Sequence, residues 1–468
     1  MDDFLREIQT SVFREWINNQ KRDYYHLHQS ETDPDAIIIE NEYCYSYVTF
    51  NPQCIIELCV MNKRTDEMAF YLHFQFKTLK HAISLFEEMD QCIKKMVDQP
   101  MCRLLLCCSG GMTTAFFADK IKNGIKVLNL NMEVAATSYQ KIYNVAQNYD
   151  VILLAPQVSY VKLQVEKVFK NKLVLKIPTQ IFASYNVGAL ITFVEESLKH
   201  KENKYNGYVE PLASMMEIKT NKHVLAVSIN ANGENSHISY RLYNSHQDIV
   251  LDSNIIKSNI KLQDVLDALD TVVLQNEMID VISIALPGVM VEGNVYSGII
   301  EGGNHQLKER LEKRYEKEIY LINDVNAAVV GYYASQNEYK SLAFLFQPIG
   351  RMAGSGIIVS GQLVRGMDHL AGEVALLPLK LSDSYLNLAN TPEGTLELVT
   401  KNIMSIIAIV APEAIVVYSD LILDSQDVSD EIKKSLSQYS LKVYPKIIKV
   451  ENILEYILLG AMILSAKE

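Results

Sequence analysis

Residues 104–114, LLLCCSGGMTT, place two adjacent cysteines between an apolar run and a small, hydroxyl-rich turn. The run that ends at Cys108 predicts a buried strand, and TTAFFADKIKNG, residues 113–124, predicts a helix that ends at a glycine. In a parallel sheet, the turn from a strand into a helix lies at the carboxyl edge, where ligands bind. We therefore expect a ligand site at this turn.

The turn suits an anion and one reactive thiol. Free N–H groups of a first helical turn favour an anion, and the glycines of SGGMTT let the backbone curl close around it. A thiol at a helix N-terminus has its pKa drawn below about 8.5. Because successive strand residues face opposite sides, only Cys108, which adjoins the turn, is placed for this chemistry.

A simple packing role is the competing interpretation for both thiols, because free cysteines are commonly small buried hydrophobic residues. We favour packing for Cys107 and chemistry for Cys108. A tyrosine-phosphatase loop is excluded, because it needs an arginine six residues after its cysteine, and that position holds Thr114 for Cys108 and Thr113 for Cys107.

The residues around the turn alternate between strand and helix patterns. After the first helix come the strand KVLNLNMEV, the helix SYQKIYNVAQ, the strand DVILLAP, the helix SYVKLQVEKVF, the strand KLVLKIP and the helix ALITFVEESLKH. Repeated strand–helix units predict a parallel sheet covered by helices on both faces. We therefore expect residues 99–200 to form an α/β domain.

CSGGMTT, followed by AFFADKIKN and then by DVILLAPQVSY, resembles the IIB domain of the lactose/cellobiose class of the bacterial sugar phosphotransferase system. The resemblance covers nearly all of residues 101–200 and implies a four-stranded parallel sheet flanked by helices. It implies that Cys108 is a phosphocysteine, which accepts a phosphoryl group from a histidine of a IIA protein and passes it to sugar held by a membrane IIC subunit. The residues implied to surround the phosphate are Ser109, Gly110, Gly111, Met112, Thr113 and Thr114 as its backbone cradle, with Pro156, Gln157 and Tyr160 near the site.

Three further segments complete the chain. Residues 1–98 contain alternating, aromatic-rich runs and then a helical pattern, which predicts a small α+β domain of unknown role. Residues 201–219 are polar at the start, contain Gly and Pro, and predict a linker. Residues 220–468 begin a larger α/β pattern with HVLAVSI.

The C-terminal segment places an acidic residue at a strand end. In LINDVNAAVVGYY the strand turns at Asn323 and Asp324, and we expect the helix to start at Ala327. An Asp at such a place can act as general base toward a sugar hydroxyl, or it can simply cap the helix. Nearby, GRMAGSGIIVSGQLVRGMDHLAGEV is rich in glycine and separates two strands, as a phosphate loop, a sugar loop or a glycine-rich hairpin does.

Together with SIALPG and the closing LLGAMIL helix, these motifs resemble the ROK family of sugar kinases and sugar-responsive repressors over residues 220–468. The resemblance implies a two-lobed, actin-like ATPase fold with sugar in the cleft. It implies that Asn323 binds sugar hydroxyls, that Asp324 is the catalytic base and that Glu373 binds sugar. Because ROK proteins often pair through their C-terminal lobe, it also implies a homodimer.

The departures from the ROK pattern concern ATP and zinc. The first phosphate loop, of DxGGT type in the family, is replaced here by SINAN, residues 228–232, without the acid or the glycines. The second loop is GRMAGSG, residues 350–356, and no cysteine cluster follows Glu373. Because transfer from ATP depends on holding and neutralising its phosphates, we expect a kinase-inactive sugar sensor without a cofactor or a metal ion.

The composition narrows the classes of function. The chain has 468 residues, 49% of them hydrophobic and 21% charged, which predicts a globular protein of several domains. A formal charge of −12 argues against a nucleic-acid partner. All seven cysteines lie in the first 108 residues, and their odd number suits reduced thiols. Neither a secretory signal nor a run of about 18 apolar residues is present, which predicts a cytoplasmic location.

Three functions stay open at this point. The first is a IIB-like phosphocysteine carrier coupled to a domain that senses a sugar or a sugar phosphate. The second is an ATP-dependent ROK sugar kinase with an appended IIB domain. The third is a sugar-responsive regulator without catalysis, for which DNA binding is not expected because strands dominate residues 36–76, where a recognition helix would lie.

Overall fold

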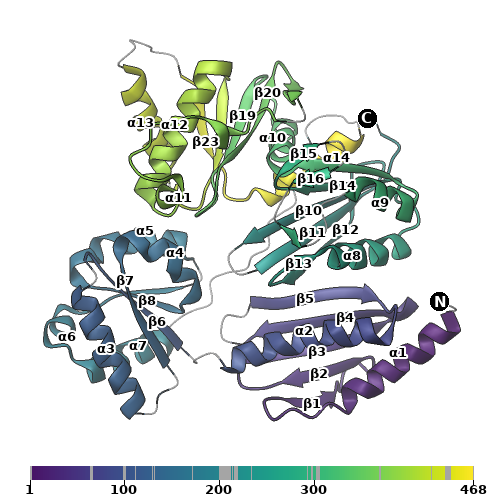
Figure 1. Ribbon diagram of the computed structural model, residues 1–468, viewed down its shortest axis with the longest axis horizontal. Helices are drawn as coiled ribbons and strands as arrows, with labels where there is room; N and C mark the ends of the chain where they lie inside the picture. The colour runs from purple at the N-terminus through teal and green to yellow at the C-terminus, as the bar shows by residue number, and fades with distance from the viewer. Residues whose placement is uncertain are drawn as a thin grey trace.

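The computed structural model shows the chain as packed α/β bodies (Figure 1). The described residues are 3–63, 67–98, 102–110, 112–128, 130, 132–170, 172–199, 212, 214, 220–232, 235–291, 294–296, 299–301, 306–367, 370–422, 424–437 and 444–466. Within these ranges, no helix is both long enough and apolar enough to cross a bilayer. Most of the predicted linker, residues 201–219, lies outside the described residues.

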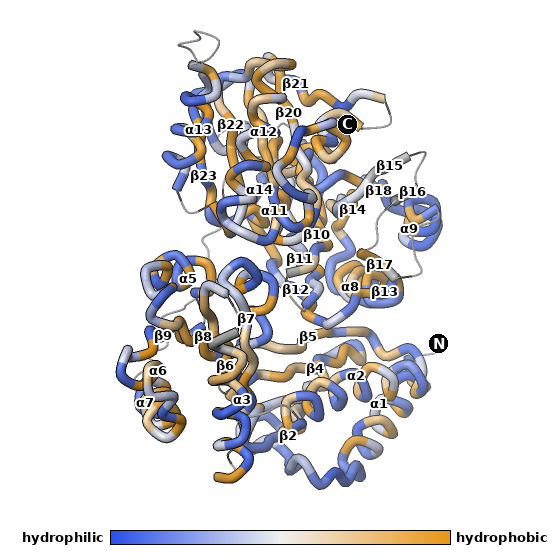
Figure 2. The backbone as a smooth tube through the Cα atoms, turned by 60° about the vertical axis from the view of Figure 1, so that its left-hand side comes forward, coloured by the Kyte–Doolittle hydropathy of each residue, from blue (hydrophilic) through white to orange (hydrophobic). Residues whose placement is uncertain are grey.

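Residues 102–199 form the predicted four-stranded parallel sheet, in the order β7-β6-β8-β9. Its strands are β6 (Cys102–Cys108), β7 (Met132–Ser138), β8 (Val151–Leu154) and β9 (Leu173–Lys176). The helices around it are α3 (Met112–Val127), α4 (Ile142–Val145), α5 (Lys162–Val168), α6 (Thr179–Ser184) and α7 (Val187–Lys199). The two central strands, β6 and β8, are almost wholly apolar and buried because both faces of the sheet are covered there (Figure 2).

The C-terminal half folds as two lobes, which confirms the expected actin-like architecture. The first lobe contains β10 (Val224–Asn232), β11 (Asn235–Tyr243), β12 (Ile249–Lys257), α8 (Leu262–Gln275), β14 (Val281–Leu286), α9 (Leu307–Tyr315) and β18 (Glu318–Asn323). The second lobe contains β19 (Leu342–Phe346), β20 (Gly354–Val359), β21 (Gln362–Leu363), α11 (Tyr385–Leu388), α12 (Pro392–Val410), β22 (Ala414–Tyr418), α13 (Ser425–Ser437) and β23 (Lys446–Lys449). Two closely crossed helices, α10 (Asp324–Ala334) and α14 (Leu454–Ala466), lie at the junction of the lobes.

The N-terminal segment continues the sheet of the first lobe. It contains α1 (Asp3–Asn18), β1 (His26–Gln29), β2 (Ala36–Glu40), β3 (Cys44–Asn51), β4 (Ile55–Asn62), β5 (Glu67–Gln75) and α2 (Leu79–Asp98). Antiparallel pairing of Tyr71 in β5 with Ile256 in β12 joins the two sets of strands. The result is one ten-stranded sheet in the order β1-β2-β3-β4-β5-β12-β11-β10-β14-β18.

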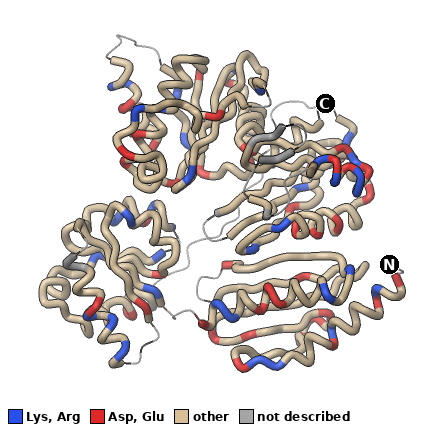
Figure 3. Tube along the Cα trace, in the orientation of Figure 1, with Lys and Arg blue, Asp and Glu red and all other residues tan. Residues whose placement is uncertain are grey.

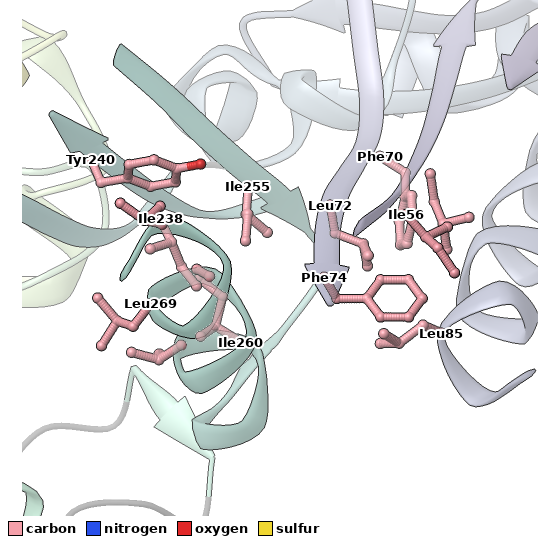
Figure 4. Close-up of a cluster of buried hydrophobic side chains, with 14 of the residues drawn as sticks. Ile56, Phe70, Leu72, Phe74, Leu85, Ile238, Tyr240, Ile255, Ile260 and Leu269 are labelled. Carbon is pink, nitrogen blue, oxygen red and sulfur yellow. The ribbon is translucent and has the colours of Figure 1, made fainter. Parts of the chain in front are cut away.

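One hydrophobic core crosses this join. Phe74 and Leu72 of β5 belong to the same buried cluster as Ile255 of β12 and Leu269 of α8 (Figure 4). The predicted small α+β unit is therefore present, but it shares its core with the first lobe of the C-terminal half.

Ion pairs hold the helices of the two parts together. The Lys257 ammonium lies 2.5 Å from Asp264 and 2.5 Å from Glu88 of α2, and its side chain is buried. Lys77 lies 2.6 Å from Asp267 of α8, and Figure 3 shows charged residues of both signs along α2 and acidic residues along α8. Because a buried charge is tolerated only when it is paired, these contacts fix how α2 sits on the first lobe.

Candidate functional site

Cys108 is the last residue of strand β6, and helix α3 starts four residues later at Met112. Ser109 and Gly110, between them, are exposed. The N-terminal turn of α3 therefore opens at the carboxyl edge of the sheet, where its free N–H groups favour an anion. Gly111 lies outside the described residues, as do the side chains of Met112, Thr113 and Thr114.

The two adjacent cysteines have different surroundings. Cys107 is fully buried, and burial together with the neighbouring Cys108 raises the pKa of its thiol to about 12. Cys108 is 4% exposed and directly precedes the exposed turn. A thiol that stays protonated is a poor nucleophile, so Cys107 is unsuited to phosphoryl chemistry at neutral pH.

The second motif lies at the same edge of the sheet. Leu154 of β8 pairs with Cys107 of β6, so the chain after β8 emerges beside the Cys108 turn. There Pro156 starts a short 3-10 helix (Pro156–Val161), in which Tyr160 is 76% exposed. Gln157 is also exposed. The structure thus brings the two motifs to one edge, and the roles of Pro156, Gln157 and Tyr160 stay predictions.

In the C-terminal half, Asn323 rather than Asp324 caps helix α10. The Asn323 Oδ1 accepts hydrogen bonds from the N–H groups of Val325 and Asn326, both at 3.0 Å. Its Nδ2 donates to the carbonyl of Gly288 at 3.1 Å. The helix therefore begins at Asp324 and not at Ala327 as expected, and the amide of Asn323 is already engaged within the protein.

Asp324 is a buried carboxyl group near a second acid. Its pKa is raised to about 6, chiefly by burial and to a lesser extent by charge repulsion from Glu373, while hydrogen bonds from backbone N–H groups oppose the shift. Burial also raises the pKa of Glu373. Asp324 directly follows the end of β18. Asp324 and Glu373, two carboxyl groups with raised pKa values, form a candidate sugar site.

Two glycines allow the elements that carry these acids to approach each other. A Cβ at Gly356 of β20 would lie 2.6 Å from the Val325 carbonyl oxygen of α10. Gly372 has a positive φ of 93°, and a Cβ there would lie 2.0 Å from the carbonyl oxygen of Ser355. These glycines serve close packing of β20 against α10 and the turn before Glu373.

The second glycine-rich loop is tied down by the protein itself. The Gly350 N–H donates to the Ala389 carbonyl at 3.0 Å, and the Ala353 N–H donates to the Tyr385 hydroxyl at 3.2 Å. Tyr385 in turn donates to Gln347 at 2.8 Å. Two of the N–H groups that could hold a phosphate are therefore engaged, and no motif in the sequence indicates that Tyr385, far from the loop along the chain, contacts it.

Family models match two separate segments of the chain. Residues 103–191 match the model of the lactose/cellobiose-specific IIB subunit of the phosphotransferase system, and residues 234–394 match the model of the ROK family. A curated relative, the oligo-beta-mannoside-specific EIIB component of the phosphotransferase system of Bacillus subtilis (strain 168), is 30% identical over 67 residues. That match spans 14% of this chain and 65% of the relative, so it covers less than two thirds of that protein.

Solved structures include similar proteins of both kinds. A ROK family protein from Streptococcus pneumoniae TIGR4, in complex with sucrose, is 18% identical and covers 52% of this chain and 97% of its own, with a TM-score of 0.41. A ROK hexokinase from Thermus thermophilus is 16% identical over 52% of this chain and 99% of its own, with a TM-score of 0.42. The lactose-specific IIB component domain from Streptococcus pneumoniae is 23% identical over 20% of this chain and 95% of its own, with a TM-score of 0.19.

The two predicted resemblances are thus confirmed by the family models. Residues 103–191 match a IIB subunit of the lactose/cellobiose class of the sugar phosphotransferase system and residues 234–394 match the ROK family, and we call the domains that contain these segments the IIB domain and the ROK-family domain.

Proposed function

We propose that the IIB domain is a phosphocysteine carrier and that the ROK-family domain senses a sugar or a sugar phosphate without using ATP. The observation that carries this proposal is the place of Cys108, at the end of β6 beneath the exposed turn that opens onto the N-terminus of α3. In the proposed step, the Cys108 sulfur attacks the phosphorus of a IIA phosphohistidine. The S–P bond forms as the P–N bond breaks, and the histidine nitrogen takes up a proton.

The surroundings of Cys108 suit a transient phosphate. The loop of residues 109–114 contains neither arginine nor lysine, so a phosphoryl group would be held by neutral N–H donors. Such donors stabilise a dianion without the ion pairs that would hold it in place, which favours a carrier over a hydrolase. A IIA protein is the implied donor, and a membrane IIC subunit with its sugar is the implied acceptor if the phosphate moves onward. A cytoplasmic location and a homodimer belong to the same proposal.

The ROK-family domain lacks support for ATP chemistry. Ser228 stands where the family has its acidic residue, and its hydroxyl is buried without a hydrogen-bond partner among the described residues. The N–H groups of Gly350 and Ala353 are engaged, as described above. Asp324 and Glu373 are retained, so sugar recognition is better supported than phosphoryl transfer from ATP.

The test is intact-mass and peptide mass spectrometry of the full chain after incubation with phosphoenolpyruvate, the general relay proteins and a IIA protein of the lactose/cellobiose class. We expect one phosphoryl group, on Cys108. The Cys108→Ser variant should carry none, and the Cys107→Ser variant, its matched control, should be labelled as the wild type is. Label that persists in Cys108→Ser would contradict the assignment.

A parallel incubation with labelled ATP, Mg²⁺ and a panel of hexoses addresses the alternative of a ROK sugar kinase. We expect no sugar phosphate in this incubation. Formation of one that stops in an Asp324→Asn variant would establish the kinase instead.

A further inference from the structure

The IIB domain packs directly against the second lobe of the ROK-family domain. Leu421, which follows β22, is 2% exposed and belongs to the hydrophobic cluster of the IIB domain, and Ile349, which follows β19, packs against that cluster. The Tyr139 hydroxyl, just after β7, donates to Glu393 Oε1 at 3.2 Å. An exposed ion pair joins Lys170 to Glu451 at 3.6 Å. Figure 1 shows the side with α4 and α5 turned toward α11 and the second lobe.

The contact covers a functional edge of the second lobe. Strands β19, β22 and β23 run parallel, and Ile349, Leu421 and Glu451 each follow the carboxyl end of one of them. Ligands of open α/β sheets bind at this edge. Ile349 also directly precedes Gly350 of the second glycine-rich loop. The IIB domain therefore contacts the residue before the second glycine-rich loop, residues 350–356, which would face a phosphate in an ATP-binding protein.

The same contact begins close to Cys108. Strands β6 and β7 pair in parallel, with Cys108 opposite Ser138, and Tyr139 is the next residue. Burial, and after it the charge of Glu393, raises the pKa of Tyr139 to about 12, so the hydroxyl is a neutral donor at physiological pH. One strand spacing of about 4.8 Å, one step along the chain and one tyrosine side chain thus connect Cys108 to Glu393.

We propose that this contact is a switch: phosphorylation of Cys108, on which the inference rests, weakens the bond between Tyr139 and Glu393 and loosens the IIB domain from the loop at residues 347–353. A phosphoryl group brings a charge of about −1.5 to −2 and disrupts contacts beside a carboxylate by like-charge repulsion. Leu421 carries no charge and stays buried in the IIB cluster, so the interface loosens without separating. Coupling of this kind is reciprocal, so a ligand of the second lobe that needs the loop free also favours phosphorylation of Cys108.

The test is hydrogen–deuterium exchange of the full chain, with the phosphorylation state of Cys108 verified by mass in every sample. Phosphorylation should speed exchange roughly two- to fivefold in residues 139–148 and 389–396, the effect expected of one weakened surface contact. Residues 36–62, in the sheet far along the chain, should not change. Glu393→Gln keeps an acceptor for Tyr139 but removes the charge, so this variant should be phosphorylated without the change in exchange. Tyr139→Phe should exchange fast in both states.

A second pair of variants tests the proposed switch without phosphorylation by the phosphotransferase relay proteins. Ser109 is exposed beside Cys108, so Ser109→Glu adds a negative charge there and Ser109→Gln is its neutral control. We expect faster exchange at residues 139–148 and 389–396 in Ser109→Glu only. If Cys108 carried no phosphate, the proposed carrier function would be wrong. The Ser109→Glu and Ser109→Gln variants would then still test whether a negative charge beside Cys108 loosens the contact. The switch is wrong if neither phosphorylation nor Ser109→Glu alters exchange, or if Glu393→Gln responds as the wild type does.

Discussion

Asp324 shows how burial sets the chemistry of a single side chain. Its folded pKa of about 6 lies above the unfolded value of 3.8, so the folded chain holds this proton more tightly than the unfolded chain does. The stabilising contribution is therefore full below pH 3.8 and is lost as the pH rises through 6. At pH 7 to 8 the buried ionised carboxylate costs about 2 to 3 kcal/mol.

We accordingly expect Asp324→Asn to raise the melting temperature at pH 7.5, with a gain that shrinks toward pH 4. Calorimetric scans of both proteins across this range measure it. The exposed Asp383 provides a control, because Asp383→Asn should shift the melting temperature little at any pH. A gain that did not change with pH would show that the carboxyl group titrates normally.

The motif residues were the most predictable part of the molecule. Cys108 and the Asn323–Asp324 pair each stand where a local strand pattern ends, so their place at a carboxyl edge followed from the sequence. The engagement of Asn323 with Gly288 did not, because Gly288 lies 35 residues away and carries no side chain to signal the contact.

At the scale of elements, β20 and the turn at Gly372 position the candidate sugar site. Gly372→Ala forces a side chain into a positive-φ turn and against the Ser355 carbonyl, so it should cost more than about 2 kcal/mol of unfolding free energy. Urea unfolding measures the loss. Gly188→Ala, at an open position of α7, should be neutral or slightly stabilising. Equal effects of the two substitutions would mean that the turn can adjust.

Strands β6, β8 and β9 could be predicted because each is a short apolar run between helical patterns. The predicted strand KVLNLNMEV was misplaced, because α3 runs past Gly124 to Val127 and the less apolar β7 spans Met132–Ser138. The continuation of the N-terminal strands into the ROK-family domain could not be predicted. The pairing of β5 with β12 joins residues 71 and 256, and the intervening IIB domain leaves no local pattern that links them. The same holds for Tyr139 and Glu393, which lie 254 residues apart.

At the scale of the whole molecule, the N-terminal segment and the first lobe should unfold together. Lys257→Met leaves the buried Asp264 without its cation and weakens the hold on Glu88, so it should cost about 3 kcal/mol. Hydrogen exchange should show lost protection in both β4 and β11. Lys261→Met removes an exposed cation from Glu88 and should cost about 0 to 1 kcal/mol, less than Lys257→Met. Lost protection confined to the first lobe would show two independent units.

The ten-stranded sheet also bears on which part of the molecule we expect to move. At about 4.8 Å per strand it spans roughly 43 Å, with α2 and α8 linked across its middle through Lys257, which pairs with Glu88 and Asp264. We expect this frame to stay fixed. Closure of the two lobes over a sugar should then rotate the second lobe about the crossing of α10 and α14, and the IIB domain packed on that lobe should move with it.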